Sequence, residues 1–201
     1  MSDAQVELPW LTAPRMQYPS DGETLAIETQ FFYGPSLLIN PVIEESSTSV
    51  SLYLPLDTWY DFYTHKPVDG AGTAITYTNV ADTDIPILVR GGSIIPLRVK
   101  SAMTTKALRD ENFELYVAPD VDGKADGTLY LDDGESLVQD GVSEIRFSWN
   151  GETIRADGTF GYGTSLRVKS ITVLGEGPKT YGLDEGLDKA WERKVGGAKE
   201  S

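Results

Sequence analysis

Apolar and polar residues alternate with a period of two along most of the chain. Val50, Leu52 and Leu54 are separated by serine and tyrosine, which is the pattern of a strand with one buried face. Residues 145–149 repeat it with an apolar residue at every second position. So many short strands predict a mainly β protein. Further strand-like runs occupy residues 58–63, 73–78, 85–89, 93–97, 113–117, 128–131, 153–156 and 166–174.

Three features of these runs predict local geometry. Arg90-Gly91-Gly92 separates two apolar runs and predicts a tight hairpin over residues 85–97. Asn150-Gly151 predicts a type I′ turn between two strands. Within residues 166–174 the apolar positions change phase at Lys169-Ser170, which predicts a β-bulge or a bend there.

The two ends of the chain differ from this pattern. Ser20-Asp21-Gly22-Glu23 fits a capping box and predicts a short helix over residues 23–32. Near the other end, apolar residues at positions 183, 187, 191 and 195 fall four apart and predict a helix. We expect residues 196–201 to be disordered. Residues 100–110 have the weakest pattern and predict the boundary between two β-domains, which gives four segments: 1–33, 34–103, 104–176 and 177–201.

Composition narrows the classes of function. The 201 residues are 40 % hydrophobic and 24 % charged, as in an ordinary globular protein. The net charge of −14 argues against nucleic acid and anionic membranes as partners, because both need clustered cations. The chain has no cysteine, so disulfides and thiolate metal sites are excluded. It begins without the features of a secretion signal, and no apolar stretch approaches the length of a membrane span.

Asp132, Asp133 and Glu135 are the first candidates for catalytic chemistry. A retaining glycosidase holds two carboxyl groups about 5–5.5 Å apart on either side of the sugar bond. Neighbouring residues of a strand point to opposite faces, so Asp132 and Asp133 make a poor pair. Asp-Gly is also a common turn signal. We therefore interpret this cluster as a turn and assign no catalytic residue.

No metal or cofactor site emerges from the sequence either. Asp120, Asp122 and Asp126 resemble a calcium loop, but Lys124 occupies a ligand position and the required glycine is missing. A solvated acidic hairpin is the favoured interpretation, with weak calcium binding as the alternative. His65 is the only histidine, so neither a zinc site nor a histidine-based triad can be built, and we expect it at the surface.

Glycine-rich and aromatic segments have equally plain interpretations. Gly91-Gly92 and Gly161-Tyr162-Gly163 lack the strand–glycine loop–helix context of a nucleotide site. The aromatic residues of segment 59–63 could stack on sugar rings, but aromatic residues on both faces of one strand favour core and edge packing.

Several phrases, in order, resemble the C-terminal region of α-glucosidases of glycoside hydrolase family 31, especially the fungal ones. The most specific is IPILVRGGSIIPL at residues 85–97. The others are QFFYGPSLLINPV at 30–42, YLP with TWYDFY at 53–63, FEL at 113–115 and LYLDDGES at 129–136. The resemblance covers residues 17–178. It implies two antiparallel β-domains of the sandwich type, proximal and distal, after a short helical remnant of a (β/α)₈ barrel in residues 1–33.

The resemblance also implies a function. Enzymes of this family hydrolyse terminal α-linked glucose with retention, using two aspartates on a barrel of at least about 200 residues. Residues 1–33 are too short for that barrel, and the family's nucleophile motif does not occur in the chain. We therefore expect a non-catalytic portion that binds no cofactor and whose partner is the barrel-bearing part of the enzyme. It would meet an α-glucoside substrate only through that part, and the parent enzyme is expected to be secreted.

Two further expectations follow from the missing barrel. A proximal domain that supports a barrel should expose an apolar face, formed by Trp10, Leu11, Phe31, Phe32 and residues 85–97. The alternative function is a standalone carbohydrate-binding β-sandwich, which would bind oligosaccharides by itself.

Overall fold

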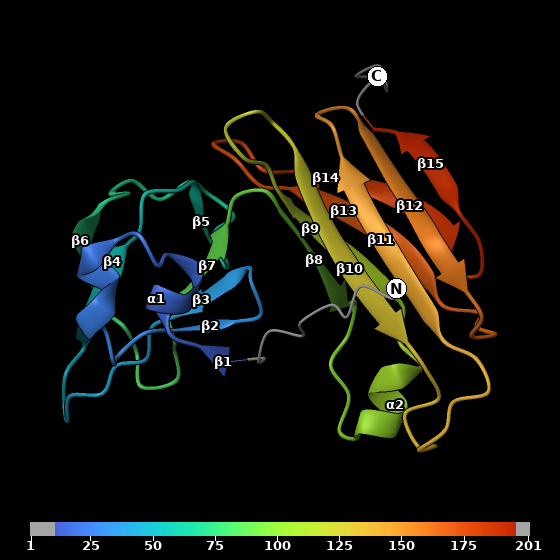
Figure 1. Cartoon of the computed structure of the whole chain (residues 1–201), viewed down its shortest axis with the longest axis horizontal. Helices are drawn as coiled ribbons and strands as arrows, with labels where there is room; N and C mark the ends of the chain where they lie inside the picture. The colour runs from blue at the N-terminus through green and yellow to red at the C-terminus, as the bar shows by residue number, and fades with distance from the viewer. Residues whose placement is uncertain (1–10, 196–201) are drawn as a thin grey trace. The chain divides into compact units, whose positions relative to one another are not determined.

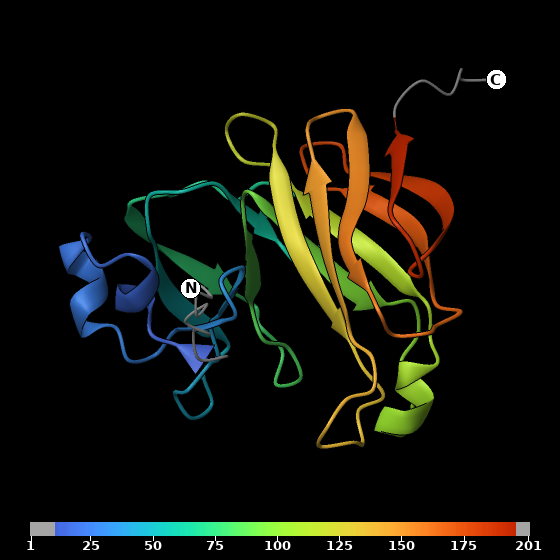
Figure 2. The same cartoon turned by 45° about the vertical axis from the view of Figure 1, so that its right-hand side comes forward.

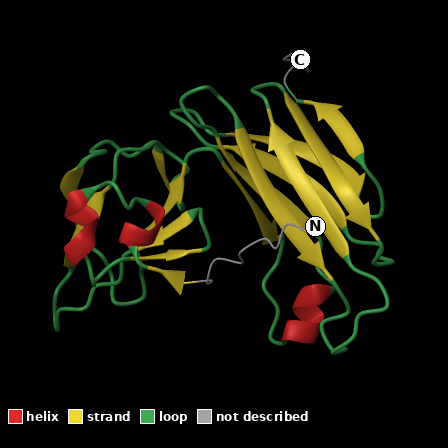
Figure 3. Ribbon diagram, in the orientation of Figure 1, coloured by secondary structure: helices red, strands yellow, loops and turns green. Residues whose placement is uncertain are grey.

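The computed structural model describes residues 11–195, which form two compact units divided between Gly91 and Gly92 (Figure 1). Strands predominate in both units and the helices are short, so the expectation of a mainly β protein is confirmed (Figure 3). Within residues 11–195 no helix has the length and apolarity needed to cross a membrane. The two units are described separately below.

The first unit contains a five-stranded antiparallel sheet and a two-stranded one. The large sheet has the order β1-β2-β3-β7-β5, and the small sheet pairs β4 with β6. Their bounds are β1 Leu11–Thr12, β2 Phe31–Tyr33, β3 Leu37–Ile39, β4 Ser49–Leu54, β5 Trp59–Asp61, β6 Thr73–Thr78 and β7 Ile87–Arg90.

Both sheets contribute to the core of this unit. The large sheet supplies Phe32, Leu38, Trp59 and Leu88, and β4 supplies Leu52 and Leu54 from its alternating apolar positions. All six side chains are almost completely buried. The period-two pattern at residues 50–54 therefore identified the inward face of β4.

The N-terminal segment of the first unit contains two short helical turns. They are α1 Pro14–Gln17 and the 3₁₀ helix η1 Gly22–Ala26. The predicted helix over residues 23–32 is wrong in its extent and its cap. Asp21, and not Ser20, caps the turn by accepting a hydrogen bond from the backbone N–H of Glu23 at 3.1 Å. Residues 31–33 are recruited into β2 by pairing with β3, and this tertiary pairing overrides helix propensity.

Tyr18, Asp57 and Arg90 tie this segment to the sheet. The Tyr18 hydroxyl donates to Asp57 Oδ2 at 2.8 Å, and Arg90 Nε donates to the same oxygen at 2.7 Å. The Tyr18 ring also packs against Phe32 and Trp59, with centroids 6.0 and 6.4 Å away. Burial, more than the nearby carboxylate, raises the pKa of the Tyr18 phenol, and Arg90 opposes the rise. The phenol therefore stays protonated and able to donate.

The second unit is a single eight-stranded sheet that folds into two layers. Its order is β14-β13-β9-β8-β10-β11-β12-β15, and all pairs are antiparallel except β13–β9 and β8–β10. Figure 2 shows β10, β11 and β12 in front of the other layer. The elements are β8 Ser93–Arg98, α2 Thr105–Arg109, β9 Phe113–Ala118, β10 Ala125–Leu131, β11 Ser143–Trp149, β12 Thr153–Phe160, β13 Arg167–Val173, β14 Lys179–Gly186 and β15 Trp191–Lys194.

One short parallel contact between β8 and β10 joins the two layers. Asp126 is paired with Ser93 and donates its backbone N–H to the Gly92 carbonyl at 3.0 Å. At Gly127 the strands approach so closely that a Cβ would lie 2.1 Å from the Ile94 carbonyl oxygen. Inward residues of seven strands, among them Ile94, enclose one buried core, and half-buried Tyr181 and Leu183 of β14 pack against it. The expected antiparallel sandwich is therefore confirmed, with two parallel pairs added.

The predicted hairpin over residues 85–97 is wrong. β7 pairs with β3 and β5 in the first unit, whereas β8 pairs with β9 and β10 in the second. Gly92, at φ +81°, lies where the chain passes from one unit to the next. The structure consequently divides the chain at residues 91–92, earlier than the expected boundary between 103 and 104. The segment expected as a linker contains α2 and lies within the second unit.

The predicted C-terminal helix is also wrong. Residues 179–186 form β14 and residues 191–194 form β15, where a helix was predicted. A spacing of four fits a strand as well as a helix, because four is a multiple of the strand period of two. Leu187 and Val195 are buried in the core of the second unit. The expected disorder of residues 196–201 lies outside the described residues.

Two turn predictions have different outcomes. The bulge at Lys169-Ser170 is confirmed, since the register of β13 shifts between Val168 and Ser170 against both neighbouring strands. The β11–β12 hairpin exists, but Gly151 has a positive φ of +97° and Asn150 does not. A type I′ turn needs positive φ at both central residues, so that prediction of turn type is wrong. Instead, Asn150 Oδ1 accepts the backbone N–H of Thr153.

The boundary at residues 91–92 can be tested with two fragments. We expect residues 92–201 alone to unfold in one cooperative thermal transition, because they contain the whole two-layer sheet. Residues 104–201 lack β8, the strand between β9 and β10, and should bind a hydrophobic dye without a sharp transition. Equal cooperativity of the two fragments, measured by circular dichroism, would contradict the division.

The anchor formed by Tyr18, Asp57 and Arg90 gives a second test. Replacing Asp57 with Ala leaves the partly buried Arg90 and the Tyr18 hydroxyl without their acceptor, and should cost about 1–3 kcal/mol of unfolding free energy. Tyr18→Phe removes one hydrogen bond and should cost about 0.5–1.5 kcal/mol. Hydrogen exchange of the β7 amides in the 201-residue chain measures both. Equal protection of the β7 amides from exchange in Asp57→Ala and in the wild type would contradict the role of this anchor.

Candidate functional site

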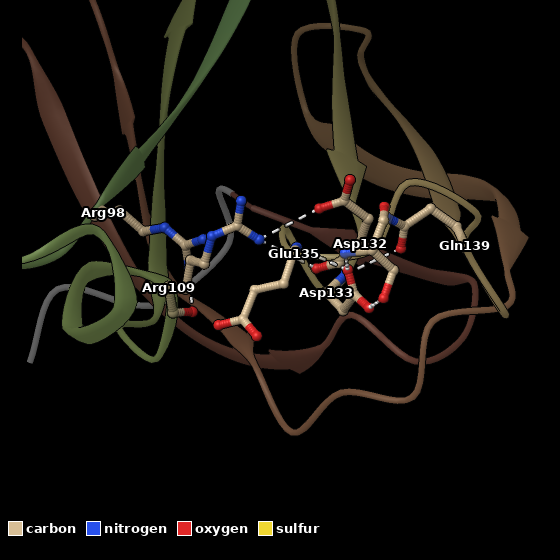
Figure 4. Close-up of polar contacts among 7 residues, drawn as sticks. Arg98, Arg109, Asp132, Asp133, Glu135 and Gln139 are labelled. Carbon is tan, nitrogen blue, oxygen red and sulfur yellow. Dashed lines mark hydrogen bonds and ion pairs between the residues drawn. The ribbon is translucent and has the colours of Figure 1, made fainter.

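Asp132, Asp133 and Glu135 lie in the loop that follows β10. Asp132 accepts a hydrogen bond from Nη1 of Arg109 at 3.3 Å, and the two residues form an ion pair. Arg109 is the last residue of α2, so this pair joins the connection between β8 and β9 to the loop after β10. Figure 4 shows the Arg109 guanidinium directed at Asp132, while the Glu135 carboxylate points away from Asp132.

Asp133 shapes the turn that follows it. Its Oδ1 accepts the backbone N–H groups of Glu135 at 2.9 Å and Ser136 at 3.0 Å, and its Oδ2 accepts the Ser136 hydroxyl at 2.6 Å. These hydrogen bonds, the Ser136 hydroxyl first, hold the pKa of the Asp133 carboxyl well below its ordinary value. A general acid needs a raised pKa. The environment of Asp133 is thus that of a turn residue, as its sequence context indicated.

Gly134 lies directly against the Arg109 guanidinium. The glycine has φ +66°, and a Cβ at this position would lie only 1.6 Å from Cζ of Arg109. The guanidinium therefore occupies the space of the missing side chain. The positive φ is what favours a glycine here, and the Arg109 side chain uses the space that the glycine leaves open.

Arg98 holds the end of α2 from the other side. Its Nη1 donates to the carbonyl oxygens of Arg109 at 3.1 Å and Glu111 at 2.5 Å. Its guanidinium lies over the Phe113 ring, with Cζ 3.9 Å from the centroid. Burial, and then the charge of Arg109, lowers the pKa of Arg98. Two arginines and one aspartate thus fix the α2 segment beside the carboxylate loop.

Two pockets adjoin this loop. The first, of about 170 Å³, is lined by Arg98, Arg109, Tyr130, Leu131, Asp132, Tyr162 and Leu166. The second, of about 260 Å³, is lined by Asp133, Gln139, Asp140, Gly141, Gly161, Tyr162 and Gly163. Tyr162 borders both. Sequence reasoning did not single out Tyr130, although an exposed aromatic at an outward position of an alternating strand is a signal it could have used.

The other candidates from the sequence do not come together. Asp120 Oδ1 accepts the backbone N–H groups of Asp122 and Lys124, both at 2.9 Å, so it closes a turn. Among residues 11–195 no group of three His, Asp or Glu side chains is placed to hold a metal ion. His65 is half-buried, at φ +62°, where we expected a surface residue.

The aromatic segment 59–63 divides between core and surface. Trp59 and Tyr60 are buried, whereas Tyr63 is exposed and its ring packs edge-on against Phe62. The expected apolar face is only partly present. Leu11 and Ile85 are exposed, but Phe32 and the centre of β7 belong to the core of the first unit. They are buried because β2 and β7 are inner strands of its sheet. Trp10 lies outside the described residues.

Comparison with known proteins identifies the family. Residues 7–95 match the glycosyl hydrolase family 31 C-terminal domain. A probable alpha/beta-glucosidase agdC of Aspergillus flavus is 47% identical over 174 residues, which are 87% of this chain and 20% of that protein. A probable alpha/beta-glucosidase of Arthroderma benhamiae is 49% identical over 160 residues, 79% of this chain and 18% of that protein.

Solved structures give the same answer for the fold. The Tris-bound glucosidase II alpha subunit is 25% identical, with a TM-score of 0.75 over 94% of this chain and 24% of that one. The fold therefore belongs to the β-rich C-terminal regions of glycoside hydrolases. The chain is a member of glycoside hydrolase family 31, as its phrases indicated. It spans about a fifth of the length of the curated relatives that it matches.

The low pKa of Asp133 makes a prediction about acid stability. The folded pKa lies below the ordinary unfolded value of about 3.9, so ionised Asp133 stabilises the fold above that pH. This contribution is lost as the pH falls through the folded pKa. Asp133→Asn should therefore destabilise the chain at pH 7, and the difference from wild type should shrink below about pH 4.

Urea unfolding between pH 7 and pH 2.5 measures this difference. Glu176→Gln is the matched control, because it neutralises an exposed carboxylate in the β13–β14 turn. A wild-type and Asp133→Asn difference that stays constant over the whole pH range would contradict the assignment.

Proposed function

We propose that this chain is the non-catalytic C-terminal β portion of an α-glucosidase and that it supports a catalytic barrel in the rest of the enzyme. The coverage of the relatives carries the proposal, because glucosidases of which the matched segment is only about a fifth align with this chain over most of its length. The proposed parent reaction is hydrolysis of terminal α-linked glucose with retention. The relatives' names include both alpha- and beta-glucosidase, so the anomeric specificity is part of the proposal.

The environments of the carboxylates support a non-catalytic role. A retaining pair needs one carboxylate free to attack and one acid with a raised pKa. Asp132 is engaged by Arg109, and Asp133 is engaged by backbone amides and a hydroxyl. Asp57, the partly buried carboxylate of the first unit, is engaged by Arg90 and Tyr18. Each of these carboxylates thus already has structural partners.

The first unit is the part proposed to meet the barrel. Its N-terminal segment runs through α1 and η1 before entering β2, and the network at Asp57 fixes it to the sheet. A segment held in this way can transmit the position of a preceding barrel element to the β-domain. The second unit has its own closed core and would not be needed to complete the first.

Activity measurements test the proposal directly. We expect the purified 201-residue chain to release no glucose from maltose or p-nitrophenyl α-glucoside. In the whole enzyme, Asp132→Asn, Asp133→Asn and Glu135→Gln together should leave kcat for maltose within about threefold of wild type, because these groups would take no part in bond cleavage.

Two outcomes would overturn the proposal. One is turnover by the isolated chain that scales with its concentration and disappears with the triple substitution. The other is a loss of kcat by several orders of magnitude in the whole enzyme while its thermal stability is unchanged.

A further inference from the structure

The two pockets of the second unit adjoin each other at Tyr162, which lines both. We call this pair of pockets the Tyr162 groove, defined by the linings of the 170 and 260 Å³ pockets given above. Tyr162 is common to both pockets, and the consecutive residues Asp132 and Asp133 each line one of them. The two pockets are therefore neighbours on the second unit, and both linings contain polar side chains.

Tyr162 is held in place at the centre of the groove. Its backbone N–H donates to the Ser143 hydroxyl at 3.1 Å, and the preceding Gly161 N–H donates to the Val142 carbonyl at 2.9 Å. The backbones are so close that a Cβ on Gly141 would lie 2.4 Å from the Gly161 carbonyl oxygen. Part of the wall of the second pocket is therefore bare glycine backbone beside Tyr162, whose side chain packs partly against the core of the second unit.

The polar groups of the groove are also held before any ligand arrives. Arg98 and Arg109 are fixed by carbonyl and carboxylate acceptors, as described above. Gln139 donates from Nε2 to the Ser136 carbonyl at 2.5 Å, and its Oε1 accepts the Asp133 N–H at 3.4 Å. Side chains that are already ordered lose less conformational entropy when a ligand binds.

The balance of charges selects a neutral ligand. Two arginines line the groove, but three aspartates, at positions 132, 133 and 140, line it too. An anion such as phosphate would meet excess negative charge, and a cation would meet two guanidinium groups. Exposed Tyr130 and half-buried Tyr162 offer ring faces, while carboxylate, amide and guanidinium groups offer acceptors and donors. Neutral rings bearing many hydroxyl groups satisfy both kinds of surface.

We propose that the Tyr162 groove is a binding site for a neutral oligosaccharide. The sugar rings would lie against Tyr130 and Tyr162, with their hydroxyl groups at Asp132, Arg109 and Gln139. The choice of an α-linked glucan as the ligand rests on the proposed function of the parent enzyme. The site would hold a polymeric substrate to the enzyme without taking part in bond cleavage.

Gly163 provides a substitution that fills the groove and spares the fold. It lines the second pocket, its φ is outside the left-handed region, and a Cβ there would meet no atom within 4 Å. Gly163→Leu should therefore fold normally while blocking the pocket. Gly175→Leu is the matched control, because Gly175 is equally open, lies in the β13–β14 turn and does not line the groove. Tyr130→Ala removes an exposed ring from the first pocket.

The experiment titrates the ¹⁵N-labelled 201-residue chain with maltoheptaose and follows backbone amide shifts. We expect changes at Gly141, Gly161 and Gly163, and binding about 3- to 10-fold weaker in Gly163→Leu and in Tyr130→Ala. Gly175→Leu should bind like the wild type. Inorganic phosphate, titrated in parallel, should leave these amides unshifted.

Several outcomes would overturn the groove as an oligosaccharide site. They are no shift with maltoheptaose at millimolar concentration, unchanged affinity in either groove variant, equal loss in Gly175→Leu, or shifts with phosphate alone. The proposed function can fail independently. If the whole enzyme does not hydrolyse maltose while the groove binds maltoheptaose, only the proposed parent activity is wrong. If the whole enzyme hydrolyses maltose while the groove does not bind maltoheptaose, only the proposed oligosaccharide site is wrong.

Discussion

The close approach of β8 and β10 is the constraint on which the second unit depends. Two four-stranded layers are joined along one edge by the pairing of Ser93 with Asp126, reinforced by the hydrogen bond to Gly92. Gly127 makes this contact possible, since any Cβ there would overlap the Ile94 carbonyl. The layers must meet at this line for their inward residues to enclose a core. The most family-specific phrase of the chain therefore encodes a backbone contact and a crossing between units, and not a hairpin.

The same closure creates the Tyr162 groove at one end of the sandwich. β8 leads into α2, and β10 leads into the loop of Asp132, so the two connections start from paired strands. Arg109 and Asp132 then join them by an ion pair that is partly exposed, and such pairs contribute little stability by themselves. The ion pair instead positions its surroundings, because it holds the Arg109 guanidinium over Gly134 and keeps the loop beside Tyr162. Strand pairing in this way determines which side chains line the groove.

The sequence was sufficient for features that depend on local periodicity. Alternation identified the buried face of β4, and the change of phase at Lys169-Ser170 identified the bulge of β13. The sequence was insufficient wherever the secondary structure of a segment depends on which other strands it pairs with. The spacing of four in the C-terminal segment fits either a helix or a strand, and only pairing with β12 and β13 makes it two strands. The groove was missed for the same reason, because Tyr130 and Tyr162 are far apart in the chain.

The distribution of charge shows why a glycosidase-like sequence need not contain glycosidase chemistry. Catalysis by a retaining enzyme depends on carboxyl groups whose pKa values are pushed apart by their surroundings. Here Asp57 and Asp132 are held in ion pairs with arginines, and hydrogen bonds to Asp133 lower the pKa of that carboxyl. Carboxylates in such surroundings stabilise turns and anchor segments. Asp132 and Asp133 also offer hydrogen-bond acceptors in the Tyr162 groove, where the proposed ligand is neutral.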